Sequence, residues 1–507
     1  MKIISTDKQV KIGAVLSYVS IVISVLSGMI YTPWMIKCIG QSDYGLFTLA
    51  NSLISLFIVD FGLSNAVSRF LSVYYSKHQE EKANDMLGLV YKLYLLIDVI
   101  ILIVLVVLYF FIGKIYTTLT VMELQKFKLV FIVLGLYTLA NFPFITLNGI
   151  LYAREKFIQI RLFDIMSRLL IVALMLILLE LGYGLYAVVF VNVGVGLLFI
   201  VLKLLLIKRT KLAKPNLKFF DSALLKDIFK FSIWVTVSLL AQRLIFSIVP
   251  SILAITLGTA AISVFGIAST IENYTYSIVT AINGFFMPSV ARLYANDENA
   301  DIQPLMTKIG RYNFAVFGII FAGFLVFGKS FIQIWVGNDY ADSYYILCLI
   351  LFSELFGSAF SIGNIALTVK NRVKEQALIT LVSGIINVFL VFVCTKYVGV
   401  IGAGISIAIA RIISLIIILL LFKRLLGMRY RSFFFDVYFK HSIPLVIIVA
   451  EGFILQRFIA CSSWSRLILL TAIVFVSYLI FIFLFSLSSS EKKSILNYMK
   501  KMKRKKT

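Results

Sequence analysis

Long apolar runs recur along almost the whole chain, and they constrain its fold more than any other feature. Fourteen runs reach the length of about 20 residues that a membrane-spanning helix needs. They occupy residues 12–36, 44–68, 86–112, 127–152, 160–181, 183–207, 228–257, 260–290, 312–336, 341–369, 375–397, 400–422, 441–460 and 464–487. A water-soluble core cannot bury 61% hydrophobic residues, because surface area limits what a core holds. We therefore expect an all-α polytopic membrane protein with about 14 transmembrane helices. A soluble enzyme, a disordered chain and a secreted disulfide scaffold are excluded.

The distribution of lysine and arginine predicts how these helices are oriented. If the N-terminus is cytoplasmic, 35 of the 48 basic residues lie in or next to the N-terminus, the cytoplasmic loops and the tail, and 8 lie in outer loops or at the adjoining ends of apolar runs. The other five lie within apolar runs: Lys92, Arg168, Lys203, Arg243 and Arg411. Because cytoplasmic loops carry the excess of basic residues, both termini are predicted to be cytoplasmic. The net charge of +24 then reflects membrane topology, and we expect no nucleic acid partner.

The chain is poor in the residues that hold metals or carry out catalysis. Its four cysteines are far apart and match no metal or redox spacing, and it has only two histidines. No segment between the apolar runs is longer than about 25 residues, so no extramembrane domain is large enough to hold an active site. We expect a protein that is not an enzyme and that has no cofactor and no metal site.

Two related halves follow one another in the sequence. Matching residues recur at offsets of 216 to 218: Pro33 and Pro250, Gly40 and Gly258, Asn148 and Asn364, Gly184 and Gly402. An even number of helices per half makes the repeats parallel, and such bundles can rock around a cleft between them. Pro33 and Pro250 each remove a backbone hydrogen bond. They are predicted to act either as passive kinks or as hinges.

The repeat predicts the order of segments along the chain. An N-terminal six-helix lobe (1–207) is joined by a basic cytoplasmic linker (208–230) to a C-terminal six-helix lobe (231–422). A basic cytoplasmic loop (423–440), two extra transmembrane helices (441–487) and a basic cytoplasmic tail (488–507) follow. The tail is either a solvated end or a contact with anionic lipid.

Several stretches of the first half resemble a known family. They are Gly13–Ser20, Gly28–Trp34, Ile39–Leu49 with its Gly-x-x-x-Tyr-Gly signature, and Asp60–Arg69. They are similar to the polysaccharide transport proteins of the multidrug/oligosaccharidyl-lipid/polysaccharide exporter superfamily, above all to the repeat-unit flippases of O-antigen and capsule assembly. The two extra helices resemble the layout of the lipid II flippase branch. The resemblance implies a V-shaped pair of lobes with a central, often cationic cavity.

Basic residues inside the apolar runs are the candidate substrate contacts. A charge at mid-bilayer costs roughly 2.5–3.5 kcal/mol on insertion scales, so it usually faces a partner or a water-filled cavity. Arg243 and Arg411 have no opposite charge one turn away; Glu272 or Glu354 could pair with them, or they could bind a lipid-linked diphosphate bidentately. Arg168 could instead neutralise Asp164 four residues before it. Lys92 could snorkel to the cytoplasmic surface.

Acidic residues inside the runs are the candidate ion-coupling groups. They are Asp60, Glu272, Glu354 and Asp164. Burial disfavours a charged carboxylate, so such a group could take up a proton or bind a sodium ion.

These features together predict a flippase of the bacterial inner membrane. We expect it to move undecaprenyl-diphosphate-linked oligosaccharide repeat units to the outer leaflet by alternating access, for O-antigen, capsule or exopolysaccharide assembly. The undecaprenyl carrier is implied by the resemblance alone. Expected partners are membrane lipid, a coupling proton or sodium ion, and the polysaccharide polymerase and assembly machinery. The alternatives are an ion-coupled multidrug or small-solute antiporter of the same superfamily, or a membrane polysaccharide polymerase.

Overall fold

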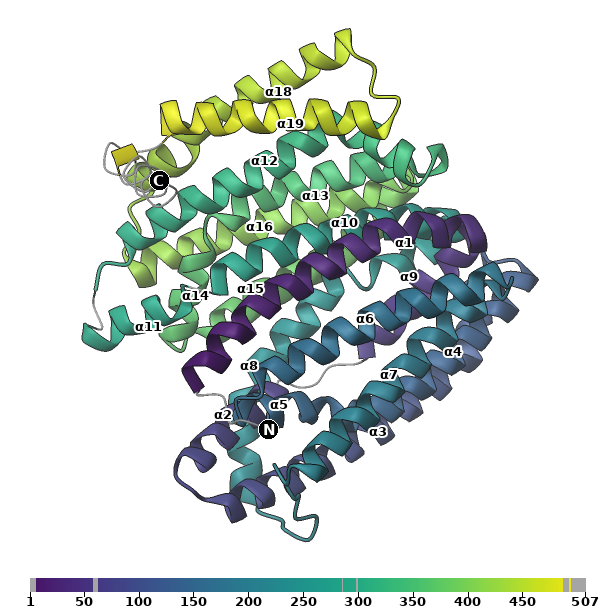
Figure 1. Ribbon diagram of the computed structural model, residues 1–507, viewed down its shortest axis with the longest axis vertical. Helices are drawn as coiled ribbons and strands as arrows, with labels where there is room; N and C mark the ends of the chain where they lie inside the picture. Colours follow the sequence, from purple (N-terminus) through teal and green to yellow (C-terminus); the bar gives the residue numbers. More distant parts are fainter. Residues whose placement is uncertain (1–5, 58–62, 285, 298–299, 487–491, 494–507) are drawn as a thin grey trace, which may run out of the picture. The chain divides into compact units, whose positions relative to one another are not determined.

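The computed structural model describes residues 6–57, 63–284, 286–297, 300–486 and 492–493, and every regular element within these ranges is helical (Figure 1). The first half contains α1 (Thr6–Phe57), α2 (Leu63–Ser76), α3 (Glu80–Ile115), α4 (Val121–Asn141), η1 (Phe142–Ile145), α5 (Thr146–Ala153), α6 (Phe157–Glu180) and α7 (Gly184–Arg209). An all-α membrane fold is thus confirmed.

The second half repeats this order of elements. It contains α8 (Ser222–Ile245), α9 (Val249–Thr256), α10 (Thr259–Gly284), α11 (Met287–Asn296), α12 (Gln303–Trp335), η2 (Asn338–Tyr340), α13 (Asp342–Ser358), α14 (Ser361–Val369), α15 (Val373–Val398) and α16 (Ile401–Leu426). The chain continues through α17 (Tyr430–Phe434), η3 (Phe435–Phe439), α18 (Lys440–Phe458), α19 (Trp464–Phe481) and η4 (Ile482–Ser486).

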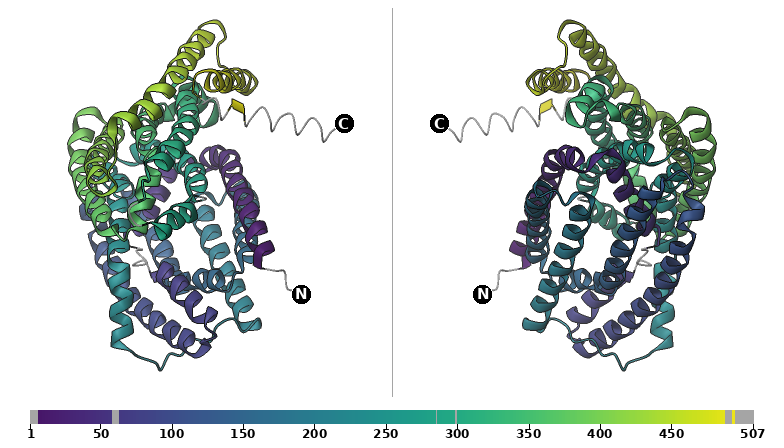
Figure 2. Two further views of the ribbon diagram at one scale, coloured as in Figure 1. Left: turned by 90° about the vertical axis from the view of Figure 1, so that its left-hand side faces the viewer. Right: turned by 90° about the vertical axis from the view of Figure 1, so that its right-hand side faces the viewer.

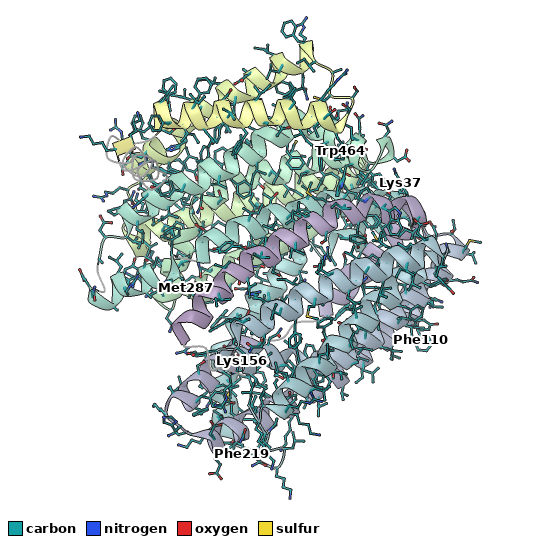
Figure 3. All side chains as sticks on the ribbon, viewed as in Figure 1. Lys37, Phe110, Lys156, Phe219, Met287 and Trp464 are labelled. Atoms are coloured by element: carbon teal, nitrogen blue, oxygen red, sulfur yellow. The ribbon has the colours of Figure 1, made fainter. Side chains whose placement is uncertain are left out.

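Twelve helical segments of the described chain are long and apolar enough to cross a membrane. Two of the fourteen expected runs account for the difference. The first run and residues 44–57 of the second lie on α1, which counts as one segment, and the eighth run coincides largely with α10, which is not among the twelve. Large apolar side chains such as Phe110, 73% exposed, stand on the outer faces, where a membrane would cover them (Figure 3).

Gly40 divides α1 into two helices. Its backbone has φ 83° and ψ 168°, a conformation that is essentially restricted to glycine. An uninterrupted helix of 52 residues would be roughly 78 Å long at 1.5 Å per residue, far more than a bilayer core of about 30 Å. The turn at Gly40 therefore ends the first span and begins the second.

The internal repeat is visible in the turns as well as in the sequence. Residues with positive φ pair up at nearly constant offsets: Gly40 with Gly258 (218), Glu155 with Asn371 (216), Gly182 with Gly399 (217), and Lys211 with Gly427 (216). Left-handed backbone is uncommon, above all for residues with a side chain. Four matched turns at nearly constant offsets therefore mean that the two halves have the same backbone conformation at equivalent turns.

Contacts along the backbone divide the chain into two compact units. The first contains Met1–Ser269 and Val373–Ala410, and the second contains Thr270–Arg372 and Arg411–Thr507. In the first unit α6 packs on α1, and its counterpart α15 packs on α8 and α9. In the second unit α12 packs against α13, and the α18–α19 hairpin lies beside α12 (Figures 1 and 2). The two six-helix lobes expected from the sequence stay a prediction.

The predicted cytoplasmic linker is docked on the first unit. Its backbone follows the start of α3: the amide of Lys214 donates to Asn84 Oδ1 (2.8 Å), and the amide of Asn216 donates to the Asn84 carbonyl (2.9 Å). Arg154, after α5, donates from Nε to the carbonyl of Leu212 (3.0 Å). Three segments that were predicted to be cytoplasmic, 69–85, 153–161 and 208–230, thus meet at one end of this unit.

Candidate functional site

A buried cluster of three charged side chains lies inside the second unit. Arg411 on α16 donates from Nη2 to Glu272 Oε1 on α10 (3.1 Å) and from Nη1 to Glu354 Oε2 on α13 (2.5 Å). The side chains are 19%, 6% and 13% exposed, respectively. Three helices that are distant in sequence therefore place one guanidinium between two carboxylates.

The charge of this cluster determines what it can do chemically. A guanidinium offers two planar pairs of donors and stays protonated, so it can hold two carboxylates at once. Charges inside membrane segments usually face a partner or a water-filled cavity, and here the three side chains are one another's partners. With all three groups ionised the cluster carries one excess negative charge, which a proton or a monovalent cation would neutralise. Two of the four carboxylates expected to couple ions, Glu272 and Glu354, thus share this cluster with Arg411.

Arg243 lies in the first unit, in the last turn of α8. Its side chain is half-buried, and the residue is not without an interaction partner. Its carbonyl accepts from the amides of Ser247 (2.9 Å) and Ile248 (3.1 Å), so it stands where the chain bends from α8 into α9. Non-helical backbone inside a membrane occurs where it is buried in protein or lines a water-filled cavity. Here Asn387 Nδ2 on α15 donates to the carbonyls of Leu244 (3.1 Å) and Ile245 (3.0 Å).

The other predicted basic contacts have partners within the first unit. Lys92 on α3 donates from Nζ to the carbonyl of Phe219 (3.0 Å), so it anchors the linker. Figure 3 shows Phe219 and Lys156 toward one end of this unit, and Lys37 and Phe110 toward the other. The guanidinium of Arg168 lies over the ring of Tyr31, 5.7 Å from its centroid.

Asp164 pairs with a different arginine from the one suggested by the sequence. Arg161 Nη1 lies 3.2 Å from Asp164 Oδ2, one turn before it on α6. The Nε atom of Arg168 is buried without a hydrogen-bond partner among the described residues. Residues three apart, such as Arg161 and Asp164, and residues four apart, such as Asp164 and Arg168, both lie on one face of a helix. Sequence spacing alone therefore could not decide between the two arginines.

The remaining predicted residues occupy different settings. Asp60 lies outside the described residues. Pro33 lies inside the helical part of α1 before Gly40, whereas Pro250 lies in the first turn of α9, where proline costs no hydrogen bond. The hinge role of both prolines stays a prediction.

One polar residue that the sequence did not single out connects several helices. Glu123 on α4 accepts from Ser42 Oγ (2.5 Å) and Thr259 Oγ1 (2.8 Å), both on Oε1. Its other oxygen accepts from the amide and the hydroxyl of Thr120, each at 2.9 Å. The Thr120-x-x-Glu123 pattern is a capping box that signals a helix start. Nothing in the sequence signals the contacts with Ser42 and Thr259.

The chain was compared with known proteins. A family described as "Polysaccharide biosynthesis protein" matches residues 11–294. Among curated proteins, the "Uncharacterized membrane protein EpsK" of Bacillus subtilis (strain 168) is 22% identical over 499 residues, which cover 95% of this chain and 96% of that protein.

Solved structures share the fold. The structure titled "Lipid II flippase MurJ, inward closed conformation" is similar with a TM-score of 0.73 at 17% identity, over 93% of this chain and 97% of that chain. An inward-facing multidrug resistance MATE family transporter of the MOP superfamily gives a TM-score of 0.65 at 14% identity, over 81% of this chain and 98% of that one. These similarities show that the chain shares its fold with these structures.

Proposed function

Since this chain belongs to the polysaccharide biosynthesis protein family, we propose that it is a flippase for undecaprenyl-diphosphate-linked oligosaccharide repeat units. It is a multi-pass membrane transporter of the multidrug/oligosaccharidyl-lipid/polysaccharide exporter superfamily. In the proposed cycle, repeat units enter from the cytoplasmic leaflet of the bacterial inner membrane and leave in the outer leaflet by alternating access. Their use is the assembly of O-antigen, capsule or exopolysaccharide.

One observation carries the proposal. A chain matched by a polysaccharide biosynthesis family shares its fold, over 93% of its length, with a lipid II flippase. Moving a lipid-linked saccharide is the task that fits both the family and this fold. The short segments between the helices hold no separate extramembrane domain in the described ranges, which disfavours the polymerase.

The proposed roles of individual residues follow from their settings. Arg243 is the foremost candidate for the diphosphate, because it lies at a helix break inside the membrane region. Arg411 is held by Glu272 and Glu354, so we assign this cluster to ion coupling: uptake of a proton or a sodium ion would loosen one carboxylate from the guanidinium. Arg168 and Lys92 remain proposed substrate contacts of lower rank, and Asp164 remains a proposed ion-coupling group of lower rank.

The test is a strain that lacks this protein. We expect its surface polysaccharide to be lost, and complete lipid-linked repeat units to accumulate on the cytoplasmic leaflet. Arg243→Ala should fail to restore the glycan although the protein reaches the membrane, and Arg243→Lys should restore it in part, because lysine keeps the charge but not the bidentate geometry. Arg457→Ala, at an exposed site near the end of α18, is the matched control and should restore it fully.

A second candidate is an ion-coupled antiporter for cationic drugs or small solutes. The excess carboxylate of the Arg411 cluster favours it, because a negative site in the membrane attracts cations. Normal surface glycan in the deletion strain, together with new sensitivity to cationic drugs, would select this candidate. If Arg243→Ala restores normal surface glycan to the deletion strain, Arg243 has no part in the transport mechanism.

A further inference from the structure

The Glu123 cluster joins equivalent turns of the two halves. Ser42 follows Gly40 by two residues, and Thr259 follows Gly258 by one, and both glycines have positive φ. These turns start the second helix of each half. A single carboxylate oxygen of Glu123 accepts from both hydroxyls, at 2.5 and 2.8 Å. One side chain of α4 therefore bridges the two repeats, entirely within the first unit.

The backbone is tightly closed around this bridge. A Cβ atom on Gly45 would overlap the carbonyl oxygen of Thr259. Ser263, which is fully buried, donates from Oγ to the carbonyl of Gln41 (2.5 Å). The helix after Gly40 and the start of α10 are thus in direct backbone contact, with no room for a side chain between them.

The loop before α4 strengthens the closure. The hydroxyl of Tyr116 lies 3.2 Å from Ser251 Oγ on α9, and both side chains are buried. The hydroxyl of Thr118 donates to the carbonyl of Ala254. At this end of the unit, hydrogen bonds therefore join the first half to α9 as well as to α10.

We propose that Glu123 is the latch of the outer gate: it holds the predicted outer end closed through Thr259 of the second half, and it releases Thr259 in each transport cycle. This inference rests on the proposed flippase function, because alternating access requires this end to open. Hydrogen bonds to a half-buried carboxylate can be exchanged for water, which makes the closure reversible. Hydrogen bonds to this carboxylate, beside the close backbone contact at Gly45, can therefore hold the gate closed and still be broken in each cycle.

The first experiment locks the latch covalently. Ser42→Cys and Thr259→Cys are combined in a chain whose four native cysteines are replaced by serine, and a short bis-methanethiosulfonate bridges them. Both native hydroxyls contact the same oxygen, so a short bridge spans the two positions. We expect at least a ten-fold loss of transport, restored when dithiothreitol removes the bridge.

The matched control bridges two positions within the first half. Asp43 and Lys126 form a salt bridge of 2.8 Å between α1 and α4 beside the latch. The same reagent applied to Asp43→Cys/Lys126→Cys should leave transport within two-fold of the unbridged protein. Unchanged transport in the bridged Ser42→Cys/Thr259→Cys protein, or an equal loss in the control, would overturn the latch.

A second experiment needs no knowledge of the cargo. Ser263→Cys is labelled with a membrane-impermeant maleimide added outside intact cells, in the cysteine-free chain. Glu123→Ala should raise the labelling rate at least five-fold, because the gate opens more often, and Glu123→Gln should raise it less. Glu451→Ala removes a membrane carboxylate bonded to Ser477 and should leave the rate unchanged. Faster labelling with no glycan phenotype would retain the latch and reject the flippase; equal rates in all variants would reject the latch.

Discussion

At the scale of the residue, the sequence identifies the buried charges but does not predict which of them meet. Arg411, Glu272 and Glu354 stand out in the sequence because charges inside apolar runs are costly. The sequence also names the two glutamates as potential partners of the arginines. It cannot show that all three meet, because 57 and 139 residues separate Arg411 from its two partners. Only the tertiary fold brings α10, α13 and α16 together at this point.

Removal of Arg411 should destabilise the protein more than removal of an exposed arginine. Arg411→Ala leaves two buried carboxylates without a cation, and breaking a buried pair in this way costs about 3–5 kcal/mol. We expect a clearly lower midpoint of thermal unfolding in detergent, and partial recovery when Glu272→Gln is added, because one uncompensated charge is then removed.

The control for this prediction is Arg429→Ala. The bridge of Arg429 to Asp301 is 66% and 55% exposed, and exposed pairs contribute about 0–1 kcal/mol. Its unfolding midpoint should stay close to that of the unmodified protein. Equal midpoints for Arg411→Ala and Arg429→Ala would mean that the buried cluster does not stabilise the fold.

At the scale of the element, turns were easier to predict than helix interiors. The offset of Gly40 and Gly258 pointed to equivalent positions, and both turn out to be helix breaks with positive φ, a conformation for which glycine has no steric penalty. The same offset made Pro33 and Pro250 look equivalent, yet one lies inside a helix and the other starts one. Proline is compatible with both settings, so its spacing is less informative than that of glycine.

The docked linker gives a prediction for α3. A Cβ atom on Gly88 would overlap the carbonyl oxygen of Asn216, so Gly88→Val should push the linker off the helix. We expect faster cleavage by trypsin after Lys218 in the purified protein; the bond after Lys214 precedes Pro215 and resists trypsin. Gly194→Ala on α7 is the control, because nothing lies within 4 Å of its Cβ position. A cleavage rate that stays the same in Gly88→Val would show that the linker has another anchor.

At the scale of the whole molecule, the positive-inside count and the structure agree on which segments share an end. Within the first unit, the predicted cytoplasmic segments meet at the linker, and the predicted outer segments 37–43 and 113–126 meet at Glu123. Within the second unit, the predicted cytoplasmic segments 291–311 and 423–440 meet through Arg429 and Gln303. The alternation of loops is therefore consistent within each unit, and the side that faces the cytoplasm is a prediction from charge alone.

The last prediction tests both the orientation and the number of spans, and it depends on α10. This helix is not among the twelve segments that are apolar enough to cross a membrane, yet the count of basic residues requires it to span. Met122, 70% exposed at the start of α4, and Ser462, between α18 and α19, are then separated by an even number of spans. In the cysteine-free chain, Met122→Cys and Ser462→Cys should both react with an impermeant maleimide in intact cells, whereas Lys218→Cys and Arg431→Cys should react only after permeabilisation. If α10 does not span, Met122→Cys and Ser462→Cys will react from opposite sides. Reaction of all four positions in the reverse pattern would instead place both termini outside, against the 35-to-8 distribution of basic residues.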